Sequence, residues 1–202
     1  MNTERTDIGT GFWFSWILAS VIGFGVGGAI GYAIILGLNT TPVIVGLGFG
    51  AVFGAAGGTM QWLILRRLIT GAGWWVLATS GGFALAGIAA LVVSMNLGAN
   101  SLVAGIAFVA TFGVFGGIMQ WLILRRQGVR ADQWLLATLL GLFLGFAMGF
   151  SAIVLSPTFN ALVMALFGAG FGAGSGAITG AALVRMLRQS DSSDVESMAT
   201  AH

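Results

Sequence analysis

The stretch Phe53–Arg67 reads FGAAGGTMQWLILRR, and 59 positions later Phe112–Arg126 reads FGVFGGIMQWLILRR. The two stretches are identical at 12 of 15 positions. The same shift brings three tryptophans into register, Trp16, Trp75 and Trp134, each at the start of an apolar run. Self-similarity at a fixed period indicates a repeated structural unit.

A third copy of the repeated stretch can be aligned if one residue is inserted. Gly176–Arg185 then matches Gly57–Arg66, and Gly180 falls where the earlier copies carry Gln61 and Gln120. The unit is therefore about 60 residues long and occurs three times. Its copies cover about 12–67, 74–126 and 134–188.

The composition indicates that these units fold in lipid. The 202 residues are 57% hydrophobic and 7% charged, whereas a soluble domain has roughly 25% charged residues. A membrane-spanning helix needs about 20 apolar residues. Six stretches qualify: Phe12–Gly37, Val43–Leu65, Trp74–Leu97, Leu102–Leu124, Trp134–Leu155 and Ala161–Val184. The sequence predicts an all-α polytopic membrane protein of six transmembrane helices, arranged as three tandem helical hairpins in a single domain.

The number of spans in a unit determines how the units are related. Two spans bring the chain back to its starting face, so the three hairpins are predicted to be parallel. They can close around a pseudo-threefold axis or lie in a row. Closure is preferred, because a row would leave the terminal units with unlike neighbours.

The basic residues predict the orientation. All eight lie in the tails or in the loops on one side: Arg5, Arg66, Arg67, Arg125, Arg126, Arg130, Arg185 and Arg188. By the positive-inside rule, this side and both termini are cytoplasmic. Arginine without lysine is typical of GC-rich bacterial genes, so the prediction is the cytoplasmic (inner) membrane of a prokaryote.

Two residue types indicate how the helices are held. The 34 glycines recur at helical spacing, as in Gly23, Gly27 and Gly31, which permits close backbone approach between helices in lipid. Intrachain packing is the preferred interpretation, with partner binding as the alternative. The tryptophans gather near one membrane surface, where such rings anchor helices. The predicted interface anchors are Trp16, Trp62, Trp75, Trp121 and Trp134.

The residue types inside the predicted spans exclude most function classes. No acidic residue, arginine or histidine lies inside a predicted span, and there is no cysteine. Acid–base catalysis, activated nucleophiles and most metal sites need such groups. The sequence therefore predicts no enzyme, no metal site and, with a net charge of only +2, no nucleic-acid partner.

The repeated QWLILRR motif supplies the candidate site. A glutamine inside lipid needs a hydrogen-bond partner. Gln61 and Gln120 lie on the glycine-bearing face, so interhelical hydrogen bonds are the preferred interpretation. The alternative is a ligand such as a lipid head group, a quinone or a chlorophyll-type pigment. The arginine pairs that follow set the topology and meet anionic lipids: Arg66, Arg67, Arg125 and Arg126.

The tandem GGxxQWLxLRR hairpins resemble uncharacterised prokaryotic multi-spanning membrane proteins that carry the same segment in tandem. The resemblance covers most of the chain but implies no activity. Outside the hairpins, the polar tails 1–10 and 189–202 are predicted to be disordered.

Three functions are compatible with these observations. The first is a structural or accessory subunit that packs into a larger membrane assembly, or against itself, through glycine-rich helix faces. The second is a small channel or facilitator for water or a neutral solute. The third is a subunit that binds lipid, quinone or pigment through Gln61 and Gln120.

Overall fold

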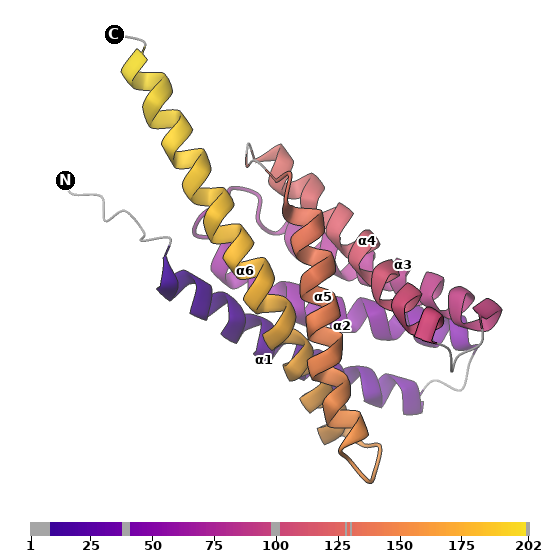
Figure 1. The fold of residues 1–202 in the computed structure, drawn as a ribbon. Helices are drawn as coiled ribbons and strands as arrows, with labels where there is room; N and C mark the ends of the chain where they lie inside the picture. The colour runs from indigo at the N-terminus through magenta and orange to yellow at the C-terminus, as the bar shows by residue number, and fades with distance from the viewer. Residues whose placement is uncertain (1–8, 38–40, 98–101, 128, 130, 201–202) are drawn as a thin grey trace.

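The structure, a computed structural model, describes residues 9–37, 41–97, 102–127, 129 and 131–200. These residues form six helices and no strand (Figure 1). The helices are α1 (Thr10–Gly37), α2 (Pro42–Leu65), α3 (Trp74–Leu97), α4 (Leu102–Arg126), α5 (Trp134–Val154) and α6 (Ala161–Thr200). All six are long and apolar enough to cross a membrane, which confirms the predicted all-α membrane architecture.

The C-terminal tail, which was predicted to be disordered from residue 189, is helical as far as it is described. Helix α6 continues to Thr200, well beyond the predicted end of the last span at Val184. Neither glycine nor proline follows Gly180, so no residue interrupts the helix. Residues 1–8, with Arg5, and Arg130 lie outside the described residues.

The helices form a closed series of neighbours. Each packs against the next in sequence, and α6 returns to pack against α1. The contacts are made at glycines. A side-chain carbon added at Gly54 of α2 would lie 2.6 Å from the Thr79 carbonyl oxygen of α3, and one added at Gly23 of α1 would lie 2.8 Å from that of Ala56. Such backbone contact is the main source of helix association in lipid.

Aromatic side chains fill the space that the helices enclose. At the end of the bundle where α2 and α4 terminate, here called the arginine end, Trp75 contacts Trp16 and Trp134 with ring centroids 5.9 and 5.6 Å apart. Farther along the bundle, Phe171 contacts Phe24 and Phe53 at 4.8 and 5.2 Å. The interior is therefore packed at both depths.

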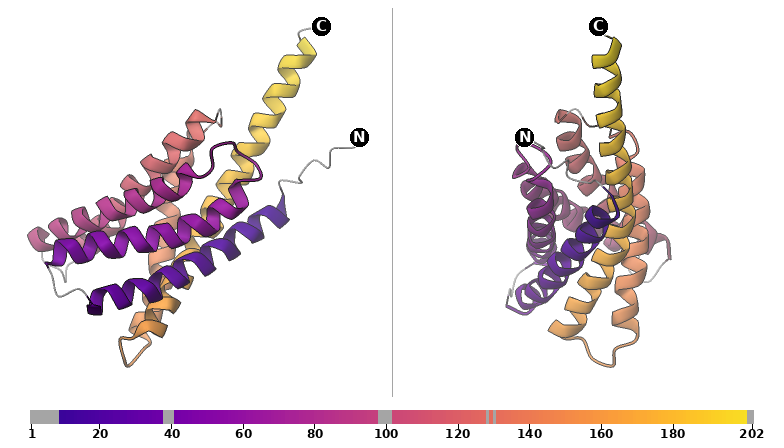
Figure 2. Two further views of the ribbon diagram at one scale, coloured as in Figure 1. Left: turned by 180° about the vertical axis from the view of Figure 1, so that it is seen from behind. Right: turned by 90° about the vertical axis from the view of Figure 1, so that its left-hand side faces the viewer.

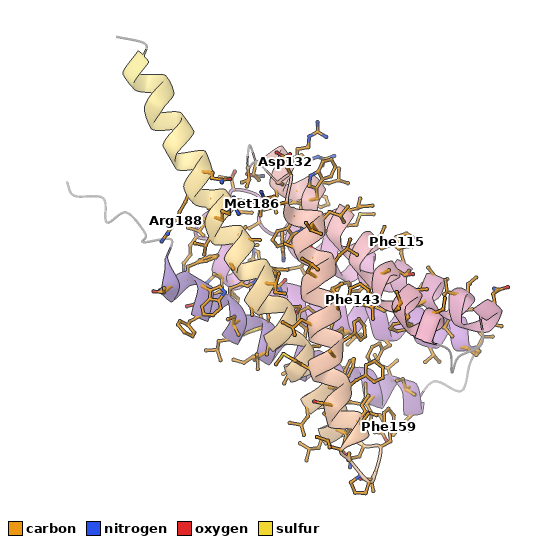
Figure 3. All side chains as sticks on the ribbon, in the orientation of Figure 1. Phe115, Asp132, Phe143, Phe159, Met186 and Arg188 are labelled. Carbon is orange, nitrogen blue, oxygen red and sulfur yellow. The ribbon has the colours of Figure 1, made fainter. Side chains whose placement is uncertain are left out.

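The two ends of the bundle differ in shape. Arg188 and Asp132 lie at the arginine end, whereas Phe159 lies at the tip of the α5–α6 hairpin (Figure 3). Toward that tip, α5 and the first part of α6 diverge from the corresponding ends of α2–α4 (Figure 2), whereas α1 stays in contact, because the Tyr32 hydroxyl donates a 3.0 Å hydrogen bond to the Phe159 backbone oxygen. Helices α2 and α3 stay in contact at the end away from the arginines, where Gly87 lies against the backbone of Gly46.

Candidate functional site: a buried amide, indole and hydroxyl network

Gln61 links three helices at the arginine end. Its side chain is 5% exposed on α2. Its Nε2 donates a hydrogen bond of 3.0 Å to Ser20 Oγ on α1, and its Oε1 accepts one of 3.0 Å from Trp75 Nε1 on α3. Both partners are fully buried. The amide therefore bonds to the protein through both its donor and its acceptor, which confirms the predicted interhelical hydrogen bonds.

Gln120 occupies the corresponding place on α4. It is 6% exposed, and its Nε2 donates a hydrogen bond of 3.0 Å to Thr79 Oγ1 on α3. Thr79 lies 59 positions after Ser20, so the two glutamines bond to equivalent hydroxyls. Thr79 Oγ1 in turn donates to the backbone oxygen of Trp75, at 2.8 Å. Gln61 and Gln120 thus belong to one network that passes through α3.

The second copy of this arrangement differs at Trp134. By position, Trp134 of α5 should donate to Gln120 as Trp75 donates to Gln61. Its side chain is 1% exposed, and its Nε1 has no hydrogen-bond partner among the described residues. A buried donor without an acceptor costs about 1–3 kcal/mol. The contact between α4 and α5 is therefore incomplete at this point.

The third copy corrects the sequence alignment. Trp16 Nε1 donates a 3.1 Å hydrogen bond to Thr179 Oγ1 on α6, so Thr179, not Gly180, occupies the place of the glutamines. A side-chain carbon added at Gly176 would lie 3.0 Å from the Ser20 Cβ. One added at Gly58 would lie at the same distance from the Cβ of Thr79, the residue equivalent to Ser20.

The contacts therefore follow a constant shift of 59 without the inserted residue. The sequence does carry a signal for this register, because a leucine recurs at this spacing. The three leucines are fully buried in the structure: Leu65, Leu124 and Leu183. The alignment with one inserted residue matched Gly176 with Gly57 and Arg185 with Arg66 instead. The arginines lie outside the core that the three leucines form.

The tryptophans divide into two groups. Trp16, Trp75 and Trp134 were predicted to anchor the protein at the lipid interface, but the structure buries them inside the bundle. The interface prediction is wrong for these three, since the closed series of helices surrounds them. Trp74, the neighbour of Trp75, is 67% exposed and has the location expected of an anchor.

The other two predicted anchors are partly buried beside arginines. Arg66 lies over the Trp62 ring at 5.2 Å, and Arg125 lies over the Trp121 ring at 5.1 Å. Contacts of this kind contribute about 0.5–1 kcal/mol at exposed sites. All four residues of the predicted arginine pairs are exposed, with Arg67 and Arg126 following in sequence.

The chemistry of this network is hydrogen bonding. Carboxamides, indoles and aliphatic hydroxyls do not titrate near neutral pH. Within the described part of the chain, no three His, Cys, Asp or Glu residues lie close enough together to hold a metal ion. Comparisons of the chain with protein-family models, curated proteins and solved structures give no match.

Replacing each buried tryptophan by phenylalanine tests the network. Trp75→Phe and Trp16→Phe leave the oxygens of Gln61 and Thr179 without their donor, whereas Trp134→Phe removes a donor that has no acceptor. We expect the first two changes to destabilise the protein by about 1 kcal/mol more than the third. Thermal unfolding in detergent measures the difference. Because the lost ring volume is the same in all three, equal destabilisation would contradict the network.

Proposed function

We propose that this chain is a non-enzymatic integral membrane protein that packs as a structural or accessory subunit within a larger membrane assembly. The observation that carries this proposal is the division between a packed interior and an apolar exterior. Aromatic rings fill the centre, and the buried amides bond to other protein groups. Each of the six helices exposes large apolar side chains. A molecule of this kind would bind other membrane subunits through its apolar outer surface.

Part of that surface suits helix packing. Most described glycines pack inside the chain, which supports the intrachain interpretation of the glycine spacing. Gly81 differs, because a side-chain carbon added there on α3 would meet nothing within 4 Å. It lies between the exposed Leu77 and Leu85. A small residue flanked by exposed leucines allows a second helix to approach closely.

The proposed arrangement is three parallel hairpins around a pseudo-threefold axis. Three observations support it: the contact between α6 and α1, the equivalent bonding of Gln61 and Gln120, and the constant shift that places Thr179 against Trp16. The arginine end is proposed to be cytoplasmic, together with both termini, in a prokaryotic inner membrane. The likeness to other tandem GGxxQWLxLRR proteins is part of the same proposal.

The channel hypothesis is disfavoured by the aromatic interior. A path along the axis would have to pass Trp16 and Trp75, which are fully buried and whose ring centroids are 5.9 Å apart. It would then meet the cluster around Phe171. Conduction needs polar groups that replace lost hydration, and these rings offer few. Transport would therefore need a second conformation.

The ligand hypothesis is disfavoured at Gln61, where both the Nε2 and the Oε1 already bond to protein groups. A quinone, pigment or lipid head group would have to displace Ser20 or Trp75. Gln120 lies beside the incomplete contact with Trp134 and is the better of the two candidates.

Purification in a mild detergent followed by mass spectrometry tests the subunit proposal. We expect other membrane proteins, or further copies of this chain, to co-purify with the wild type. Gly81→Leu should reduce their yield several-fold without lowering the melting temperature, because this residue has open space around it. The matched control is Leu18→Phe, an exposed position on α1. A lone monomer in the wild-type preparation would contradict the proposal.

A further inference from the structure

An apolar pocket lies on the side of α1–α4 away from the arginine end. Its volume is about 430 Å³, and it is partly open to the surroundings. Ile35, Val45, Phe49, Leu91 and Phe108 contribute side chains to it. All its lining residues are apolar or glycine, so it offers a ligand almost no hydrogen-bonding group.

The pocket accompanies a difference between the seams that join successive hairpins. Where α2 meets α3, Gly50 lies directly against the Phe83 carbonyl, and where α6 meets α1, Gly168 lies against that of Phe24. The equivalent residue of α4, by the shift of 59, is Val109. Its side chain prevents α4 from approaching α5 equally closely.

The second helix of each seam shows the same replacement of a glycine by a larger residue. Gly87 of α3 and Gly28 of α1 lie directly against backbone atoms of α2 and α6. The equivalent residue of α5 is Phe146, whose ring packs on Phe108 at 5.5 Å. A side-chain carbon added at Gly105, near the start of α4, would meet nothing within 4 Å. The α4–α5 seam is therefore wider than the other two, and no residue of α5 or α6 lines the pocket.

The surroundings determine which molecule enters such a pocket. The six helices have the length and composition of membrane spans, so the medium at this depth is hydrocarbon. A polar solute would lose its hydrogen bonds among these apolar walls, at a cost of several kcal/mol. A hydrocarbon chain loses none, and it regains dispersion contacts that an empty pocket lacks.

We propose that an acyl chain of a membrane phospholipid occupies this pocket, coming from the leaflet opposite the arginine end. The inference rests on the proposed membrane location and is independent of the subunit role. Val109 and Phe146 keep α5 away from α4 at this depth, and the lipid chain replaces the packing that closure of this seam would have given. The lipid is thus a component of the folded protein.

Photolabelling of the isolated chain tests this proposal. The probe is a phosphatidylglycerol with a diazirine in its acyl chain, reconstituted with the protein in vesicles and analysed by peptide mass spectrometry after irradiation. We expect labelling at Phe49 and Leu91. Val45→Trp should reduce it several-fold by filling the pocket, whereas Val43→Trp should not, because Val43 is 41% exposed on the outside of the same helix.

Two further measurements make the result decisive. Melting temperatures of both variants show whether they fold, and Val45→Phe replaces Val45→Trp if the larger side chain is not tolerated. A diazirine fatty acid without a head group is the second probe. Equal labelling of Phe49 and Leu91 in both variants would overturn the proposal, and so would labelling by the free fatty acid alone. Neither outcome affects the co-purification test, which needs no lipid probe.

Discussion

Gly168→Val is expected to prevent the bundle from closing. A side-chain carbon at this position of α6 would lie against the Phe24 carbonyl oxygen and 3.0 Å from the Gly25 nitrogen, both in the backbone of α1. Backbone atoms inside a helix cannot rotate away as a flexible side chain can. We expect a loss of more than about 4 kcal/mol, which is the range of severe steric changes. Since folded proteins are stable by only about 5–15 kcal/mol, this loss removes a large part of the free energy of unfolding, and the variant should melt far below the wild type.

The matched control is Gly105→Val on α4. It makes the same chemical change in a membrane span, but a side-chain carbon there meets nothing within 4 Å. Size-exclusion chromatography and thermal melts in detergent should show a stable, wild-type-like protein for Gly105→Val and aggregated or protease-sensitive material for Gly168→Val. A Gly168→Val protein that melts like the wild type would mean that α1 and α6 are not in close contact. The three hairpins would then lie in a row.

The helices of this protein could be predicted closely from its sequence for a physical reason. Lipid offers the backbone no hydrogen bonds, so each uninterrupted apolar run of sufficient length has to be helical. The predicted Val43–Leu65 and Trp74–Leu97 differ from α2 and α3 by at most one residue. The direction of Gln61 was equally predictable, because it follows Gly50, Gly54 and Gly57 on one helix face.

The features that sequence reasoning missed depend on how the hairpins close. A tryptophan at the start of a span is normally an interface residue. Trp16, Trp75 and Trp134 are buried only because three equivalent helix starts meet inside one bundle. The role of Thr179 was missed for a related reason: local similarity favoured an inserted residue, while its contact with Trp16 depends on the three-dimensional register.

The wide α4–α5 seam could have been found in the sequence once the correct register was known. Val109 and Phe146 replace glycines that the other two seams place against the neighbouring backbone. The unpartnered Trp134 Nε1 could not have been predicted, because it depends on the distance between two helices. Substitutions at glycine positions of a repeat are therefore the residues to compare first when the copies of such a protein diverge.

The two glutamines are expected to differ in their contribution to stability. Gln61→Ala removes two hydrogen bonds and leaves Ser20 and the Trp75 indole without their partner, whereas Gln120→Ala removes the one bond to Thr79. At about 1 kcal/mol for each bond, we expect losses of about 2 and about 1 kcal/mol. The cavity left by the change to alanine is of similar size at both sites. The difference between the two losses of stability therefore measures the difference in hydrogen bonding.

The double variant tests whether the glutamines act as one network. Gln120 bonds to Thr79, Thr79 bonds to the backbone of Trp75, and the Trp75 indole bonds to Gln61. Loss of Gln61 frees the Trp75 ring to move, which weakens the position of Thr79 before Gln120 is removed. The double loss should therefore be smaller than the sum of the single losses by about 0.5–1 kcal/mol.

Thermal melts of the two single variants and the double variant, with and without added extracted lipid, measure these losses. If the loss of stability in the double variant equals the sum of the two single losses, the two glutamines do not act as one network. Destabilisation that appears only when lipid is present would instead show that the glutamines hold a ligand. Wild-type melting of all three variants in both conditions would mean that the buried hydrogen bonds contribute nothing. The repetition of QWLILRR would then reflect duplication alone, and the glycine contacts and aromatic packing would account for the fold.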